Sequence, residues 1–314
     1  MSSRSGREGA GARPQGQRVI PAVLRAALRL GMARTFRVGL PVERQRARLR
    51  NLARLTVTPR RAGFVPARCA GVPGEWVGVR GGQRGPTTIL YLHGGGYCTG
   101  SPLTHRAITG HLAVACAARV FVADYRLAPE HPHPAAVEDA VAACRGLLEE
   151  GVAPGDLVIA GDSAGGGLSV ATALRLRELG LPQPRALVLF SPWVDLTLAG
   201  LGPLPPGEVM LTLPWVRECA AAYLAGQDPR GPLASPVGAD LRGLPSTLVQ
   251  VGTDELLLPD ARRLHQRLGE AGVTVRLEEY PARWHVFQAS AGVLADADRA
   301  LESVARFLRE TARG

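Results

Sequence analysis

Three short segments of this chain carry residues whose types and order suit nucleophilic catalysis. They are, in chain order, His93-Gly94-Gly95-Gly96, Gly161-Asp162-Ser163-Ala164-Gly165 and Trp284-His285-Val286-Phe287. Together they supply backbone donors for a developing oxyanion, a serine nucleophile and a histidine base, which are the parts that serine hydrolases combine. We therefore interpret the chain as a serine hydrolase.

Ser163 lies in a G-x-S-x-G pattern between an apolar run and a stretch of small residues. The run covers residues 157–160 and the stretch covers residues 165–176, so a strand would enter the turn and a helix would leave it. This is the context of a nucleophile elbow, where flanking glycines avoid collisions with the packed strand and helix. The helix would also point its N-terminal N–H groups at the serine.

The glycine loop follows another strand-like run, residues 88–92, and can point successive N–H groups into one space. Ester cleavage places negative charge on the carbonyl oxygen, which such donors stabilise. We assign this role to the N–H groups of Gly94 and Gly95, with the N–H of Ala164, directly after the nucleophile, as the third. His93 is interpreted as a residue that orders the loop.

Further motifs accompany these segments. They are Asp124-Tyr125-Arg126-Leu127-Ala128-Pro129-Glu130, Ser191-Pro192-Trp193-Val194-Asp195-Leu196 and Tyr280-Pro281. With them, roughly residues 40 to 311 resemble the hormone-sensitive lipase family of α/β-hydrolases, which includes the bacterial family IV esterases. The resemblance implies cleavage of carboxylic esters of short to medium acyl chain through an acyl-enzyme intermediate. It implies a small-molecule ester as substrate and no cofactor. No pair of the seven histidines shows a metal-ligand spacing, so we expect no metal.

The order of the triad in α/β-hydrolases is serine, acid, histidine. His285 follows the last strand-like run, residues 273–280, and is therefore the expected base. Asp254 and Glu255 stand side by side after the strand-like run 247–251, and either could be the acid. Family members resemble D-P-L-R-D-E here, with the acid thirty residues before the histidine, which in this chain is Glu255. The resemblance thus implies Glu255, with Asp254 as the alternative acid.

Hydrophobic periodicity predicts the elements that position these residues. Strands are expected at 75–80, 87–92, 119–124, 157–161, 186–190, 246–251 and 274–280, and helices at 104–117, 135–149, 165–180, 213–224, 260–271 and 293–311. Such alternation indicates an α/β fold with a mostly parallel central sheet and helices on both faces. This pattern and the resemblance together predict an α/β-hydrolase fold with a helical cap.

The domain organisation follows from composition. Residues 1–18 are polar and rich in Gly and Arg, so we expect a disordered basic arm, followed by one α/β-hydrolase domain at 19–314. Residues 19–57 give two helix-like stretches, and residues 196–236 interrupt the alternation of strands and helices. By resemblance, these two segments form the cap.

The net charge of +10 is unevenly distributed. Residues 1–68 hold 16 arginines and two acidic residues, whereas the remaining chain holds 21 arginines and 25 acidic residues. No basic platform bearing aromatic residues and no nucleic-acid-binding motif is found, so we expect no nucleic-acid partner. A homodimer remains open.

Five cysteines are scattered singly through the chain, which indicates free thiols and a reducing, cytoplasmic location. No apolar run is long enough for a membrane span. The apolar patch at 19–32 is interrupted by Arg25 and Arg29, and we interpret it as an amphipathic helix.

Two other functions fit the same motifs. The nearer is an amide or N-acetyl hydrolase, because the same triad cleaves both bonds. The farther is a ligand-binding receptor on a hydrolase scaffold, against which an intact Ser163 and His285 argue, since a receptor needs no base.

Overall fold

The computed structural model describes residues 16–81 and 85–312, with side chains from residue 21 onward. The prediction of a disordered arm at residues 1–18 therefore falls almost entirely outside the described residues. The first helix begins at Gly16, slightly before the predicted start of the cap.

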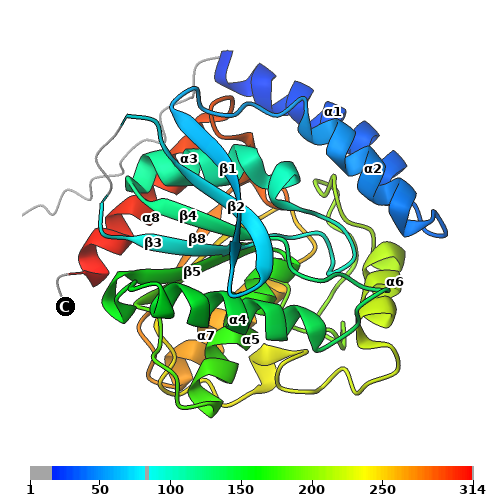
Figure 1. The fold of residues 1–314 in the computed structure, drawn as a ribbon. Helices are drawn as coiled ribbons and strands as arrows, with labels where there is room; N and C mark the ends of the chain where they lie inside the picture. The colour runs from blue at the N-terminus through cyan, green and yellow to red at the C-terminus, as the bar shows by residue number, and fades with distance from the viewer. Residues whose placement is uncertain (1–15, 82–84, 313–314) are drawn as a thin grey trace, which may run out of the picture.

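An eight-stranded sheet forms the centre of the molecule (Figure 1). Its strands are β1 (Ala62–Cys69), β2 (Val72–Val79), β3 (Thr88–Leu92), β4 (Arg119–Ala123), β5 (Leu157–Asp162), β6 (Ala186–Phe190), β7 (Ser246–Gly252) and β8 (Val275–Tyr280). Their spatial order is β1-β2-β4-β3-β5-β6-β7-β8. Only the β1–β2 and β2–β4 pairs are antiparallel. The predicted mostly parallel sheet is confirmed.

Strand β1 was not expected from the sequence. It contains Pro66, which cannot donate a ladder hydrogen bond, and it lies at the edge of the sheet with much of its length exposed. Val65 is 61% exposed, so the strand lacks the apolar run that marks the buried strands. Its pairing with β2 through a tight turn at Ala70 and Gly71 compensates for this weak local signal.

Helices cover both faces of the sheet (Figure 1). They are α3 (Arg106–Cys116), α4 (Ala135–Glu149), α5 (Ala164–Glu178), α7 (Leu258–Glu270) and α8 (Ala295–Thr311). Successive strand residues point to opposite faces, so Leu90 and Ile159 pack with α4, α5 and α7 in one core. Ile89 and Val158 pack with α3 and α8 in the other. The α/β-hydrolase fold class is confirmed.

Three further helices lie outside these layers. Helices α1 (Gly16–Thr35) and α2 (Val42–Ala53) run side by side at one corner of the molecule, and α6 (Leu213–Leu224) lies in the segment between β6 and β7 (Figure 1). Phe36, just after α1, stacks on Trp215 of α6 with ring centroids 4.2 Å apart. The two segments expected to form the cap are therefore in contact. No helix among the described residues has the length and apolar character that crossing a membrane requires.

Candidate active site

Ser163 occupies a strained turn between β5 and α5. Its φ of 52° and ψ of −122° are unusual for a residue with a side chain, and its N–H donates to the carbonyl of Phe190 on β6 at 2.9 Å. A Cβ on Gly161 would collide with the backbone of Gly165, and one on Gly165 would collide with the backbone of Leu92. The glycines flanking the serine are thus required by close backbone packing, as a nucleophile elbow demands.

His285 and Glu255 form a buried pair. The Nδ1 of His285 lies 2.7 Å from Oε2 of Glu255, and the side chains are 2% and 0% exposed. Burial alone lowers the pKa of His285, but the hydrogen bond and charge of Glu255 outweigh burial and raise that pKa above its ordinary value. The carboxylate can therefore orient the ring and stabilise its protonated form.

Two donors hold the second carboxylate oxygen of Glu255. Ser191 donates its hydroxyl to Oε1 at 2.9 Å, and the N–H of Gly252 donates to the same oxygen at 2.7 Å. Burial nevertheless raises the pKa of Glu255, against the opposing effects of His285 and Ser191. Ser191 also accepts the N–H of Val286, so it links the acid to the loop that carries the histidine.

Asp254 points away from His285 and toward the first helix. Its carboxylate lies 2.8 Å from the guanidinium of Arg25 on α1, and both side chains are partly exposed. Arg25 also donates to the carbonyl of Ala282 and lies over the ring of Trp284, 5.5 Å from its centroid. Of the two neighbouring acids, therefore, Glu255 contacts the histidine and Asp254 contacts α1.

One N–H group of the glycine loop is engaged within the protein. The N–H of Gly94 donates to Oδ1 of Asp162 at 3.1 Å, in a buried contact, which argues against our prediction that Gly94 is an oxyanion donor. The N–H groups of Gly95 and Gly96 have no protein acceptor among the described residues. The N–H of Ala164 is in the first turn of α5, where helices leave such groups without an intrahelical acceptor.

Asp162 is the centre of a buried polar cluster beside Ser163. Tyr91 donates its hydroxyl to this carboxylate at 2.7 Å, and His105 Nε2 lies 3.4 Å from it. Burial alone would raise the pKa of Asp162, but the charge and hydrogen bond of His105 lower it. The pKa of His105 is raised despite burial, because Asp162 favours its charged form. His105 was not predicted from the sequence as a site residue.

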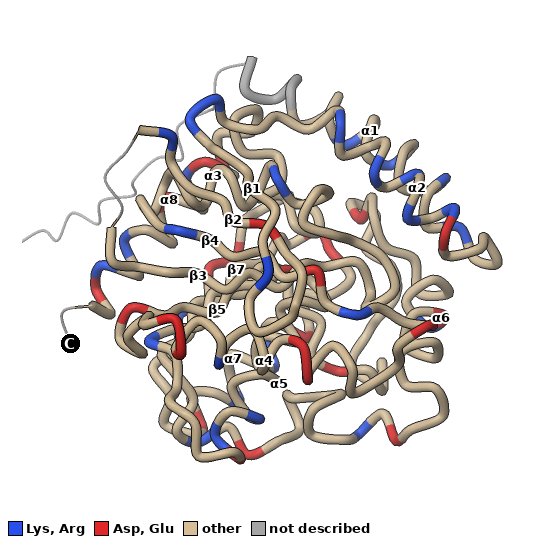
Figure 2. The backbone as a smooth tube through the Cα atoms, in the orientation of Figure 1, with Lys and Arg blue, Asp and Glu red and all other residues tan. Residues whose placement is uncertain are grey.

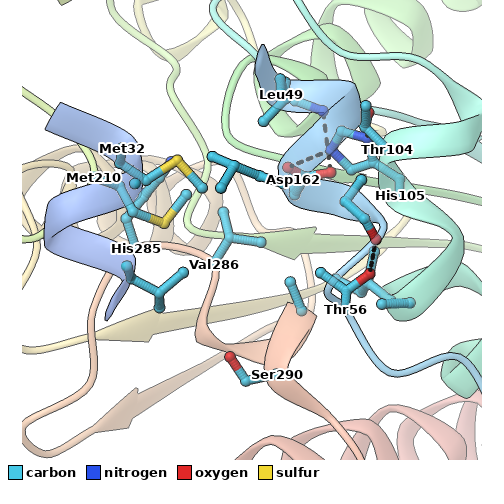
Figure 3. Close-up of a pocket in the computed structure, with 18 of the residues that line it drawn as sticks. Met32, Leu49, Thr56, Thr104, His105, Asp162, Met210, His285, Val286 and Ser290 are labelled. Carbon is cyan, nitrogen blue, oxygen red and sulfur yellow. Dashed lines mark hydrogen bonds and ion pairs between the residues drawn. The ribbon is translucent and has the colours of Figure 1, made fainter. Parts of the chain in front are cut away.

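An apolar cavity of about 380 Å³ adjoins these residues (Figure 3). Ser163 and His285 both line it, together with Gly95 and the Asp162–His105 pair. Its other walls are mainly apolar and include Leu24, Leu28 and Met32 of α1, Leu49 and Leu52 of α2, Ile108 of α3, and Met210, Trp284 and Val286 from loops. Met32 and Met210 lie together on one side of this space (Figure 3). The cavity suits an uncharged, apolar group attached to a carbonyl near the serine.

A second buried carboxylate, that of Glu208, lies near Glu255 and was not predicted from the sequence. Glu208 accepts the N–H groups of residues 209, 210 and 211 at one oxygen and that of Leu256 at the other. It thereby ties the segment between β6 and β7 to the residue after Glu255. No local pattern marks Glu208, because its partners depend on how distant loops meet. The described residues contain no group of His, Cys, Asp and Glu that could hold a metal ion.

Comparisons with known proteins find chains that are similar in sequence and structure. Residues 89–289 match a family model described as an alpha/beta hydrolase fold. The chain is 48% identical over 242 residues to an acetyl-hydrolase of Streptomyces hygroscopicus, covering 76% of this chain and 80% of that protein. It is 37% identical over 245 residues to an esterase of Acinetobacter venetianus, covering 77% and 80%. A crystal structure of an esterase from the bacterial hormone-sensitive lipase family is 38% identical and superposes with a TM-score of 0.87, covering 94% of this chain and 98% of that one.

Proposed function

Because this chain belongs to the hormone-sensitive lipase family of α/β-hydrolases and hydrolyses esters, we propose that it cleaves carboxylic esters of short to medium acyl chain on Ser163. The observation that carries the proposal is one cavity that Ser163 and His285 share, with Glu255 bonded to the far side of the histidine ring. Nucleophile, base and orienting acid are the three parts of the serine triad that carries out acyl transfer.

The proposed reaction has two halves. Ser163 Oγ attacks the ester carbonyl while His285 takes its proton, and the alcohol leaves with that proton, so that an acyl-enzyme remains. Water then attacks the acyl carbonyl and loses a proton to His285, and His285 returns this proton to Ser163 Oγ as the acid product leaves. Glu255 accepts a hydrogen bond from Nδ1 of His285 and so keeps a proton on that nitrogen. Its negative charge also stabilises the imidazolium ion.

Backbone N–H groups would hold the oxyanion in both halves. Gly95, Gly96 and Ala164 are proposed as donors, because the N–H of Gly94 is engaged by Asp162. The helix α5 adds its positive N-terminal end at the same point. Removing one such donor typically costs 10²- to 10³-fold in rate.

The lining of the cavity favours substrates with an apolar acyl group over substrates with a charged one. Apart from the catalytic residues and the Asp162–His105 pair, its walls are uncharged. Burying a charge there without a partner would be costly. We therefore expect rates to peak at short to medium p-nitrophenyl esters and to decline toward palmitate.

A substitution series tests the proposal. Ser163→Ala should abolish hydrolysis of every p-nitrophenyl ester from acetate to palmitate. Glu255→Ala should lower kcat on the order of 10³-fold or more, whereas the matched Asp254→Ala, which loses only a contact to Arg25, should stay within a few-fold of wild type. Activity that survives in Ser163→Ala, or equal losses in the two acid variants, would overturn the assignment.

Amide cleavage is the second candidate, and one relative bears on it. The protein from Streptomyces hygroscopicus is named an acetyl-hydrolase. That name specifies the acyl group but does not say whether the bond that is cleaved is an ester or an amide. An acetyl ester and the acetyl amide of the matching amine should be compared at equal concentration. A larger kcat/KM for the amide would replace the esterase proposal with that of an amide hydrolase.

We also propose a cytoplasmic location. All five cysteines are free in the structure, and four of them are buried, which supports a reducing compartment. A homodimer remains a prediction that sedimentation equilibrium can decide.

A further inference from the structure

The outward side of α1 and α2 combines exposed apolar residues with exposed arginines. We call this surface the cap face and define it by the exposed residues Ala22, Val23, Ala26, Leu30, Ala33, Arg34, Arg44, Arg48, Arg50 and Arg54. Figure 1 places both helices at the outside of the molecule, away from the central sheet.

The apolar part of the cap face is a stripe along α1. Its members recur every three to four residues, which places them on one side of the helix. Val23 is 64% exposed and Leu30 is 57% exposed, so neither is used in the core or in the cavity wall. Exposed apolar residues that gather in one patch mark interaction sites, including membrane-binding sites.

The cationic part comes mainly from α2. Residues 21–61 contain eleven arginines and one acidic residue, Glu43, and blue positions recur along both helices in Figure 2. Within the described chain, none of the five cap-face arginines forms an ion pair. By contrast, residues 69–314 carry 21 arginines and 25 acidic residues, so the excess of positive charge is confined to the N-terminal part of the chain.

The same two helices also line the active-site cavity. Their inner sides supply Leu24, Leu28 and Leu52 to its wall, and the next residues, Leu55 and Val57, line it while 81% and 47% exposed. The opening of the cavity thus has an apolar rim next to the cap face.

We propose that the cap face docks this enzyme onto lipid surfaces that carry anionic headgroups. Interfacial helices bury an apolar stripe at the level of the headgroups while flanking arginines bind the phosphates, and the cap face has both components. A nucleic acid would use the arginines but not the exposed Val23 and Leu30. Docking would turn the cavity opening toward the lipid. The consequence that lipid-borne esters reach Ser163 rests on the function proposed above, whereas docking itself does not.

Vesicle sedimentation tests the proposal. The full-length protein should pellet with vesicles of phosphatidylglycerol and phosphatidylcholine, but not with phosphatidylcholine alone, and higher salt should weaken this binding. Arg50→Gln/Arg54→Gln should weaken binding roughly 10- to 30-fold, since each arginine adds to the attraction. Leu30→Ser should also weaken it several-fold, because the apolar stripe is shortened.

Matched variants elsewhere serve as controls. Arg306→Gln/Arg309→Gln on α8 removes the same charge from exposed positions, and Leu179→Ser replaces a leucine that is 48% exposed. Both controls should bind vesicles like wild type. All four variants should keep wild-type kcat on dissolved p-nitrophenyl butyrate, since none of the substituted residues lines the cavity. Ser163→Ala should bind vesicles normally, which separates docking from catalysis.

Four results would overturn the proposal. The first is the absence of binding to anionic vesicles, and the second is an equal loss of binding in the α8 control. The third is binding that Leu30→Ser leaves unchanged but that duplex DNA displaces, which would identify a general polyanion site. The fourth is a wild-type dimer that Leu30→Ser converts to a monomer, which would show that a second copy of the chain covers the stripe.

Discussion

Single residues control the proton chemistry proposed for the site. The carboxylate of Glu255 opposes the effect of burial on His285, and the net result is a raised pKa. A base must be neutral to accept a proton, so a raised pKa moves the acid limb of the pH profile upward. Asp162 is a second residue with an effect of its own, because its carboxylate holds the glycine loop through the N–H of Gly94.

The pH profile of kcat/KM should report the pKa of His285 and its dependence on Glu255. In wild type, kcat/KM should fall as pH decreases through a midpoint above 6.5, the ordinary pKa of histidine. Glu255→Gln removes the charge that most strongly opposes the effect of burial on the pKa of His285, so the midpoint should move to lower pH while the maximal rate falls. Asp254→Asn should keep the wild-type midpoint. An unchanged midpoint in Glu255→Gln would contradict this account.

Asp162 should behave as a positioning residue. Asp162→Ala removes the acceptor of the Gly94 N–H, so the loop that presents Gly95 should lose its alignment, and kcat should fall roughly 10- to 100-fold with KM little changed. Asp162→Asn retains an acceptor oxygen and should recover much of that loss. Steady-state kinetics on p-nitrophenyl butyrate, with circular dichroism to verify folding, distinguishes the two. Equal rates in Ala and Asn variants would exclude a role for this hydrogen bond.

Among the secondary-structure elements, the contact between β5, α5 and β3 determines whether Ser163 can be presented at all. The first turn of α5 lies against the carboxyl end of β3, and only glycine fits there. This packing depends on how β5, α5 and β3 meet. Most residues of α5 are buried, so the helix cannot move away from the strands.

Gly165→Ala should therefore disrupt the elbow. The added Cβ would collide with backbone oxygens of Leu92 and His93, and backbone cannot move aside as a flexible side chain can. We expect a loss of about 3 kcal/mol or more in the free energy of unfolding, at the upper end for overpacking, together with loss of activity. Gly155→Ala, where a Cβ has no neighbour within 4 Å, is the matched control for urea unfolding. Similar stability of the two variants would refute the packing argument.

The whole molecule carries a buried acid whose titration is linked to stability. Asp260 on α7 accepts the N–H groups of Val194 and Asp195, and burial raises its pKa to about 7. The folded protein then binds a proton that the unfolded chain releases near pH 4. Since the folded state binds more protons between these values, its stability should decrease as pH rises through this window.

Urea unfolding at pH 5 and pH 8 tests this linkage. Wild type should lose stability between the two pH values, and Asp260→Asn, which keeps an acceptor oxygen but cannot ionise, should lose less. Asp240→Asn is the control, because the hydrogen bond to Arg242 holds the pKa of that exposed acid well below its usual range and outside this window. The same pH dependence in wild type and Asp260→Asn would rule out Asp260 as its source.

Local patterns in the chain were sufficient for the fold class and most elements. Apolar periodicity and turn residues are properties of neighbouring residues, so α4 and α6 begin and end where they were predicted. The order of glycine loop, serine, acid and histidine also followed from the sequence, and their catalytic roles stay predictions. Strand β1 was missed because Pro66 and its exposed edge position weaken the local signal.

Tertiary structure alone decided which groups meet. Asp254 and Glu255 are adjacent in the chain, yet one contacts Arg25, 229 residues away, and the other contacts His285. Likewise, only the approach of Asp162 shows that the N–H of Gly94 is engaged. Hydrogen bonds act over about 3 Å, and sequence patterns do not give positions at that scale when segments come from distant parts of the chain. The sequence therefore determined the chemistry available to this protein, and packing of distant segments decided how it is arranged.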